Sequence, residues 1–177
     1  RYALYVTLRY HREDGRVDEA RLLFPEHYEE AVENTPARIV ETHYHGSGGD
    51  YRQCFYNREL QFAEYDRLFP RAVAEESQED ALQLAALRLC WPYKLAKEAA
   101  DRYGAYLREH MSCAGKVYVE RQDMHMLRFF GQAGYWDQEG LDAAVDAAAG
   151  NKETEILGFL MDERRRLFPK KKKVFEL

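Results

Sequence analysis

The feature that most constrains this chain is a series of short helical runs in residues 62–169, each bounded by residues that start or stop a helix. Ser77 and Asp137 each precede a helical segment, and a further segment with apolar residues on one face begins at Asp123. Short polar side chains at such positions cap the free backbone amides of a helix start. Pro169 ends the last run, because proline lacks the amide that a helix needs. The region therefore predicts short antiparallel helical hairpins.

The boundaries of these helices follow from the same signals. Pro70 is expected to break a run over 62–76 into two short helices, and Gly115 marks a candidate break in a longer one. Beyond residue 76, we expect helices over 78–90, 94–119, 123–130, 138–149 and 152–167.

Residues 1–61 have a different pattern, in which apolar side chains recur at every second position. Leu4, Val6 and Leu8 alternate with more polar neighbours, which is typical of a strand with one apolar face. A turn at Gly15 then leads to a return strand, because glycine tolerates the positive φ of a tight turn. The return strand is expected over 17–24.

A second hairpin is expected from a strand over 38–45, a flexible turn over 46–50 and a strand over 51–60. The two hairpins together predict a four-stranded antiparallel sheet, and with the helices that follow they predict an α+β fold. We therefore divide the chain into a sheet over 1–61, helical hairpins over 62–169 and a basic tail over 170–177.

The composition excludes several classes of protein. The 177 residues are 46% hydrophobic and 32% charged with a net charge of −5, which is ordinary for a globular protein and unfavourable for phosphate binding over the whole surface. Charges interrupt every apolar run before it is long enough to cross a membrane, so no membrane partner is expected. Three widely spaced cysteines favour a reducing, cytoplasmic location.

The segment Leu141–Leu160 resembles an ankyrin repeat, because an alanine-rich helix ends at Gly150 and Asn151 and a second helix begins near Glu155. Residues 116–134 are similar to a degenerate copy of the same unit. The Thr-Pro-Leu-His motif of that family is absent from both copies. The chain is also similar to the helical-repeat tails of uncharacterised bacterial proteins. The resemblance implies stacked helical pairs that bind another protein.

The first candidate site is a metal site. His43 and His45 lie two residues apart on one expected strand, so that both side chains face the same side. Cys54, on the expected partner strand, would supply a third ligand of a kind that zinc accepts. The alternative is that all three are ordinary strand residues near a turn.

The glycine-rich stretch Gly46–Gly49 is a second candidate, because successive backbone amides can bind a phosphate. Phosphate loops usually lead into a helix, whereas this one is expected to lead into a strand. That context favours a hairpin turn.

Two further groups of residues are candidate binding surfaces. Aromatic and arginine side chains on the expected sheet can stack on bases or anchor a protein partner, and the alternative is that the tyrosines pack between sheet and helices. The basic C-terminus can contact an acidic partner or nucleic acid, and the alternative is a solvated helix end. These groups comprise Tyr5, Arg9, Tyr44, Arg52, Tyr56 and Arg58 in the sheet, and Arg164, Arg165, Arg166, Lys170, Lys171, Lys172 and Lys173 at the C-terminus.

These observations favour a protein-interaction module without catalytic activity or a cofactor, because repeat proteins form extended contact surfaces. One alternative is a nucleic-acid-binding protein that uses the Tyr/Arg sheet face and the lysine tail. A second alternative is a small metal-dependent enzyme around His43 and His45.

Overall fold

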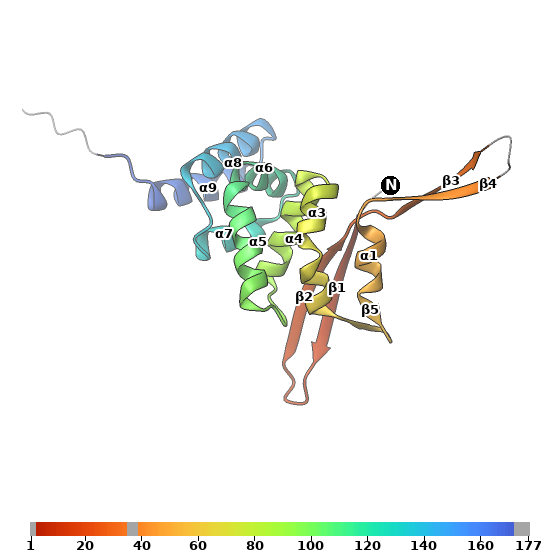
Figure 1. The fold of residues 1–177 in the computed structure, drawn as a ribbon. Coiled ribbons are helices and arrows are strands. Elements are labelled where there is room, and N and C mark those ends of the chain that lie inside the picture. Colours follow the sequence, from red (N-terminus) through yellow and green to blue (C-terminus); the bar gives the residue numbers. More distant parts are fainter. Residues whose placement is uncertain (1–2, 35–38, 172–177) are drawn as a thin grey trace, which may run out of the picture. The chain divides into compact units, whose positions relative to one another are not determined.

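A computed structural model of the chain describes residues 3–34 and 39–171, and for residues 28–45 it describes only the backbone. The fold is α+β, with helices prevailing over strands in these ranges (Figure 1). The chain divides into two compact units, residues 1–106 and residues 107–177. The division falls inside one helix and not at residue 61, because the first hairpin shares its core with the helices that follow it.

The first predicted hairpin is confirmed. Strand β1 (Leu4–His11) pairs antiparallel with β2 (Val17–Phe24), and Leu8 lies opposite Ala20. Gly15 has a φ of +83° in the connecting turn, which explains why glycine occupies that position.

The second hairpin differs from its prediction. Strand β4 (Ile39–His45) pairs with β3 (Tyr28–Asn34), a segment that the sequence analysis did not assign to a strand. The residues expected to form the partner strand form helix α1 (Gly48–Gln53) and a two-residue hairpin of β5 (Phe55–Tyr56) and β6 (Glu59–Leu60). The four-stranded sheet is therefore wrong, and the described strands form three separate two-stranded sheets.

Close packing at Gly48 explains this difference. A Cβ atom at Gly48 would lie 2.4 Å from the backbone oxygens of Pro25 and Glu26, so the glycine lets α1 begin directly against the chain that follows β2. The glycine-rich stretch thus serves a close approach of two backbones, whereas the sequence suggested a loose turn.

The first unit continues with helices over 62–90 that match their predictions and a helix over 97–109 that is shorter than predicted. The run over 62–76 breaks at Leu68, two residues before Pro70, and Ser77 caps the next helix by accepting a hydrogen bond from the Asp80 amide at 3.1 Å. The helices are α2 (Phe62–Arg67), α3 (Phe69–Glu75), α4 (Gln78–Cys90) and α5 (Lys97–Glu109).

The core of the first unit lies between β2 and these helices. Strand β2 packs against α4, and Ala20, Leu22, Leu23 and Phe24 of β2 are buried. Aromatic rings form part of this core. The ring of Tyr65 contacts those of Phe24 and Tyr51 edge to face, at centroid distances of 5.6 and 4.9 Å.

The second unit contains two helical pairs. The predicted cap Asp137 is confirmed, since it accepts a hydrogen bond from the amide of Gly140 at 2.6 Å. Asp123, which was expected as the first residue of a helix, is also a cap, because it accepts a hydrogen bond from the amide of Met126 at 3.0 Å. The predicted long helix breaks at His110 and not at Gly115. The helices are α6 (Met111–Glu120), α7 (Met124–Gln132), α8 (Gln138–Gly150) and α9 (Thr154–Leu167).

The turns inside the two pairs have the same hydrogen bonds thirty residues apart. The Asp123 amide donates to Tyr118 O at 3.0 Å, and the Glu153 amide donates to Ala148 O at 3.0 Å. The preceding residue has a positive φ in both turns, 54° at Gln122 and 58° at Lys152. Helices α6 and α8 pack against each other. The two turns therefore share one local geometry, while the assignment of residues 116–134 and 141–160 to the ankyrin family stays a prediction.

Candidate functional site

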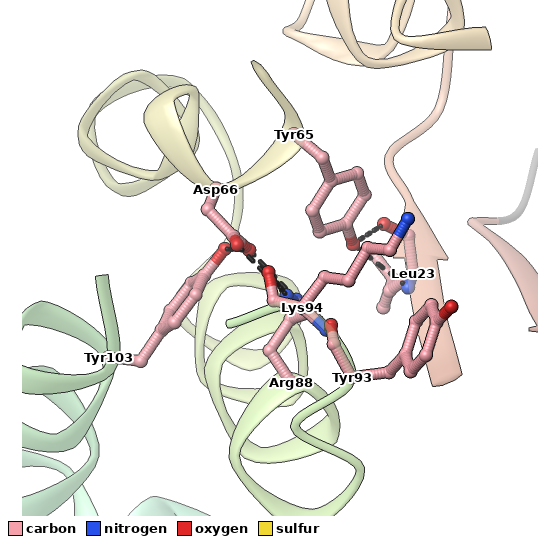
Figure 2. A network of polar contacts seen from close by, with 7 residues as sticks. All are labelled: Leu23, Tyr65, Asp66, Arg88, Tyr93, Lys94 and Tyr103. Atoms are coloured by element: carbon pink, nitrogen blue, oxygen red, sulfur yellow. Dashed lines mark hydrogen bonds and ion pairs between the residues drawn. The ribbon is translucent and has the colours of Figure 1, made fainter. Parts of the chain in front are cut away.

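The most heavily buried polar cluster of the chain is centred on Arg88 in α4. Arg88 is fully buried and forms two parallel hydrogen bonds with Asp66 of α2, at 2.8 and 2.9 Å (Figure 2). Tyr103 of α5 donates its hydroxyl to the same carboxylate at 2.8 Å, and Arg88 also donates to the backbone oxygen of Tyr93 at 2.9 Å. The cluster joins three helices and the loop after α4.

The electrostatics and the burial of this cluster favour a role in stabilising the fold. Burial alone lowers the pKa of Arg88, but the hydrogen bonds and the charge of Asp66 outweigh that effect and raise the pKa above its usual value. Burial and the neighbouring Asp66 also raise the pKa of Tyr103 well above its usual value. With Arg88 at 0% and Asp66 at 4% exposure, no ligand reaches these groups from solvent.

A second buried contact involves the hydroxyl of Tyr65. It accepts a hydrogen bond from the Leu23 amide at 3.2 Å and donates to the Leu23 oxygen at 2.6 Å (Figure 2). These two groups belong to the edge of β2 that faces away from β1, so Tyr65 occupies the place of a neighbouring strand there. The hydroxyl of the adjacent Tyr51 is buried without a hydrogen-bond partner among the described residues.

The predicted metal site does not have the strand pairing on which its prediction depends. His43 and His45 lie in β4 opposite Glu30 and Tyr28, and their side chains lie outside the described atoms. Cys54 follows α1 and does not lie on the partner strand of β4, so the predicted cross-strand arrangement is wrong. Burial raises the pKa of the Cys54 thiol to about 11, which keeps it protonated at neutral pH.

The glycine-rich stretch does lead into a helix, but its donors already have an acceptor. The amide and hydroxyl of Ser47 both donate to one carboxylate oxygen of Glu76, at 2.6 and 2.7 Å. Ser47 is fully buried. The carboxylate of Glu76 thus occupies the position that a phosphate would take, which favours a structural role for this stretch.

The aromatic and arginine residues of the predicted sheet surface lie on several separate elements. Tyr5 and Arg9 point to the same side of β1, and Tyr5 donates its hydroxyl to Gln83 of α4 at 2.7 Å. Arg52 lies in α1, Tyr56 in β5 and Arg58 in the following turn, all exposed, and the side chain of Tyr44 lies outside the described atoms. The four-stranded sheet that would have aligned them is not formed.

The second unit contains a hollow where α9 ends, which the sequence analysis located only through its basic residues. Its volume is about 680 Å³. Three of its lining residues are apolar and three are cationic, which combines apolar surface with positive charge. The lining consists of Gln138, Asp142, Met161, Arg164, Arg165, Phe168, Pro169 and Lys170.

The charges around this hollow are unevenly compensated. Arg164 pairs with Asp142 at 3.1 Å, and Arg165 pairs with Asp162 at 3.2 Å. Lys170 and Lys171 are exposed and have no acidic partner within the described part of the chain. Lys172 and Lys173 lie outside the described residues. Two exposed lysines without a described acidic partner therefore follow α9, and one of them, Lys170, lines the hollow.

Comparisons with protein-family models, with curated proteins and with solved structures found no match. Within residues 3–27 and 46–171, whose side chains the structure describes, no three histidine, cysteine or acidic side chains are grouped as metal ligands would be. In the same ranges, each helix is too short or too polar to cross a membrane.

Proposed function

We propose that the chain is a protein-interaction module whose second unit binds an acidic segment of a partner protein that also carries an apolar side chain. The observation that carries the proposal is the hollow at the end of α9, where Met161, Phe168 and Pro169 lie beside Arg165 and Lys170. Apolar side chains ringed by charge are the usual anatomy of a protein-binding surface.

The ion pairs around the hollow favour this function. The pair between Arg165 and Asp162 joins side chains that are 73% and 77% exposed, and such a pair contributes little free energy. Arg165 is therefore able to exchange Asp162 for a carboxylate of the partner at little cost. Lys170 adds a charge that has no acidic partner in the described chain.

The helical pairs support the proposal as a scaffold. Because α6 packs on α8 and the two turns share one geometry, the second unit presents α9 from a regular stack of short helices. Stacked helical pairs commonly present extended binding surfaces. The ankyrin resemblance supports the same function.

Nucleic acid is the alternative ligand, and Lys170 and Lys171 favour it. Phosphate binding needs positive charge alone, whereas apolar residues make up part of the lining of this hollow. The apolar lining therefore favours a protein segment.

A selection from a random peptide library on the full chain tests the proposal. We expect enriched peptides that combine acidic residues with a large apolar residue, and we expect Lys170→Glu with Arg165→Glu to weaken their binding at least about tenfold. Lys116→Glu is the matched control, because Lys116 is exposed on α6 and does not line the hollow.

Three results would overturn the proposal. The first is the absence of an enriched acidic and apolar motif. The second is equal loss of binding in the Lys116→Glu control. The third is tight binding of a single-stranded oligonucleotide that falls steeply with salt, because that behaviour identifies a phosphate-binding surface.

A further inference from the structure

We propose that β1 is a dimerisation edge, which pairs antiparallel with β1 of a second copy of this chain about a two-fold axis at Leu8. The pairing would join two hairpins into a four-stranded sheet, with β1 strands in the middle. The inference concerns the first unit and is independent of the proposed function.

The hydrogen bonds of the hairpin establish which backbone groups point outward. Opposite residues in an antiparallel pair alternate between those that exchange backbone hydrogen bonds and those that do not. The amide and the oxygen of Leu23 both form hydrogen bonds with the Tyr65 hydroxyl. Leu23 and the opposite residue Tyr5 are therefore a pair that does not exchange backbone hydrogen bonds. Arg21 and Thr7 lie two residues further along and are of the same kind.

The turn of the hairpin gives the same alternation. The Arg12 amide donates to Arg16 O at 2.8 Å, so even-numbered residues of β1 bond to β2. The amides and oxygens of Thr7 and Arg9 therefore point away from β2. Within the part of the chain that the structure describes, no backbone hydrogen bond is made to these outward groups.

Apart from the charge of Arg9, this edge lacks the devices that usually protect an edge strand. Strand β1 contains no proline and no lysine, and it pairs with β2 in continuous register without a bulge. Thr7 and Arg9 are exposed, and Leu4 at 56% adds apolar surface to the same strand. Unprotected strand edges readily pair with another strand.

A second copy is the partner that fits this edge best. A two-fold axis normal to the sheet leaves the same face of both copies on the same side of the joined sheet. Even-numbered residues must therefore pair with even-numbered residues of the second copy, and odd-numbered residues with odd-numbered ones. With the axis at Leu8, the outward groups of Thr7 meet those of Arg9 in the second copy, and the two strands exchange backbone hydrogen bonds at both positions. The apolar face remains continuous, because Leu8 meets its own copy and Val6 meets Tyr10.

Charge also favours this arrangement. Arg9 is the one permanent cation in β1, and the two-fold axis at Leu8 places it opposite Thr7 and not opposite its own copy. Glu19 of β2 lies 3.6 Å from Arg9 and offsets its charge on the same face. Like charges directly opposite each other would disfavour the pairing.

The first test compares Thr7→Pro with Thr7→Val by sedimentation equilibrium over a concentration series. Proline removes an outward amide that β2 does not use, so the hairpin keeps its internal hydrogen bonds. We expect the natural chain and Thr7→Val to dimerise, and Thr7→Pro to weaken the dimer at least about tenfold through loss of two symmetric hydrogen bonds. A monomeric natural chain, or equal dimerisation of Thr7→Pro, would overturn the proposal.

The second test does not depend on how well Thr7→Pro folds. In the proposed register the two Leu8 residues form a non-hydrogen-bonded pair, whose Cα atoms lie about 4.5 Å apart and suit a disulfide. We expect Leu8→Cys to form a disulfide-linked dimer under mild oxidation. Val6→Cys is the matched control, because it lies opposite Tyr10 and not opposite its own copy. Equal cross-linking of both variants, or none at Leu8→Cys, would contradict the register.

Discussion

The contacts that stabilise the interior of the first unit differ from those that stabilise the interior of the second. The described buried polar and charged side chains, Ser47, Asp66, Gln83 and Arg88, all lie in the first unit. In the second unit the close contacts are made by small residues. A Cβ at Gly115 would lie 2.8 Å from Gly140 O, and a Cβ at Gly140 would lie 2.9 Å from the Cβ of Met111.

The two kinds of contact determine the arrangement of the helices in different ways. The first unit brings helices and strands of different lengths together, and directional hydrogen bonds to Asp66 determine where α2, α4 and α5 meet. The second unit repeats one helical pair, and the absence of a side chain at Gly115 determines how closely α6 and α8 approach. Polar substitutions should therefore damage the first unit, and small increases in volume should damage the second.

The largest effect is expected from Arg88→Met. This variant leaves the Asp66 carboxylate buried without its cation and should lower the free energy of unfolding by about 3–5 kcal/mol. Urea denaturation measures this loss. The double variant Asp66→Leu with Arg88→Met should recover much of it, because both charges are then absent. A double variant as unstable as the single one would contradict the explanation.

Gly115→Ala should have the next largest effect, about 1–3 kcal/mol of destabilisation, because the added methyl group collides with the backbone of α8. Gly158→Ala is the control. A Cβ at Gly158 meets nothing within 4 Å, and alanine favours a helix interior by about 1 kcal/mol. Thermal unfolding should therefore move in opposite directions for the two variants. Equal shifts would mean that helix propensity outweighs packing in this unit.

Two tyrosines of the first unit give a sharper comparison. Tyr65→Phe leaves the amide and oxygen of Leu23 without their partner and should cost about 1–3 kcal/mol. Tyr51→Phe removes a buried hydroxyl that has no partner among the described residues, so stability should stay equal or rise. Chemical denaturation of the two variants measures the difference. A larger loss for Tyr51→Phe would refute the assignment of these hydroxyls.

The thiol of Cys54 provides a prediction about pH. Burial raises its pKa to about 11, so the folded state holds the thiol proton more tightly than the unfolded state does. The resulting stabilisation is present below the unfolded thiol pKa and is lost as the pH rises through about 11. At neutral pH, mass spectrometry after iodoacetamide treatment should find Cys54 modified far more slowly in the folded chain than in urea. Equal rates would show that the thiol is accessible.

The smallest effects concern the two turns of the second unit. Gln122→Gly and Lys152→Gly should each stabilise the chain by less than about 1 kcal/mol, because glycine adopts a positive φ without strain. Arg121→Gly is the control, since its φ of −79° is already favourable for any residue. Differential scanning calorimetry should find an increase at both turns, and a smaller one for Gln122→Gly, which also loses the hydrogen bond from its side chain to Glu153. Opposite signs would contradict the shared turn geometry.

The sequence predicted local structure well wherever the deciding residue is a neighbour in the chain. The caps at Ser77 and Asp137 and the break before Pro70 were all predicted correctly, because each acts within one helical turn. The structure of the glycine-rich stretch was not predicted correctly, because it depends on the backbone at Pro25 and on Glu76, which are distant in sequence.

The candidate sites were likewise predictable only where neighbouring residues in the chain determine them. The basic end of α9 was visible in the sequence as a run of arginine and lysine, but its ion pairs and the apolar lining at Met161 require the fold. Strand β3 escaped prediction because its glutamates obscure the alternation of apolar residues. The joint burial of Asp66 and Arg88 has no local signal, since these residues lie on different helices.

The hydroxyl of Tyr65 has a consequence for growth of the sheet. Because it occupies the edge of β2, the hairpin offers one edge for addition of a strand and not two. A unit with a single available edge forms a closed pair and then has no site for a third copy, whereas a unit with two available edges extends into a filament. In the proposed pairing, one phenolic oxygen therefore limits this hairpin to a closed pair.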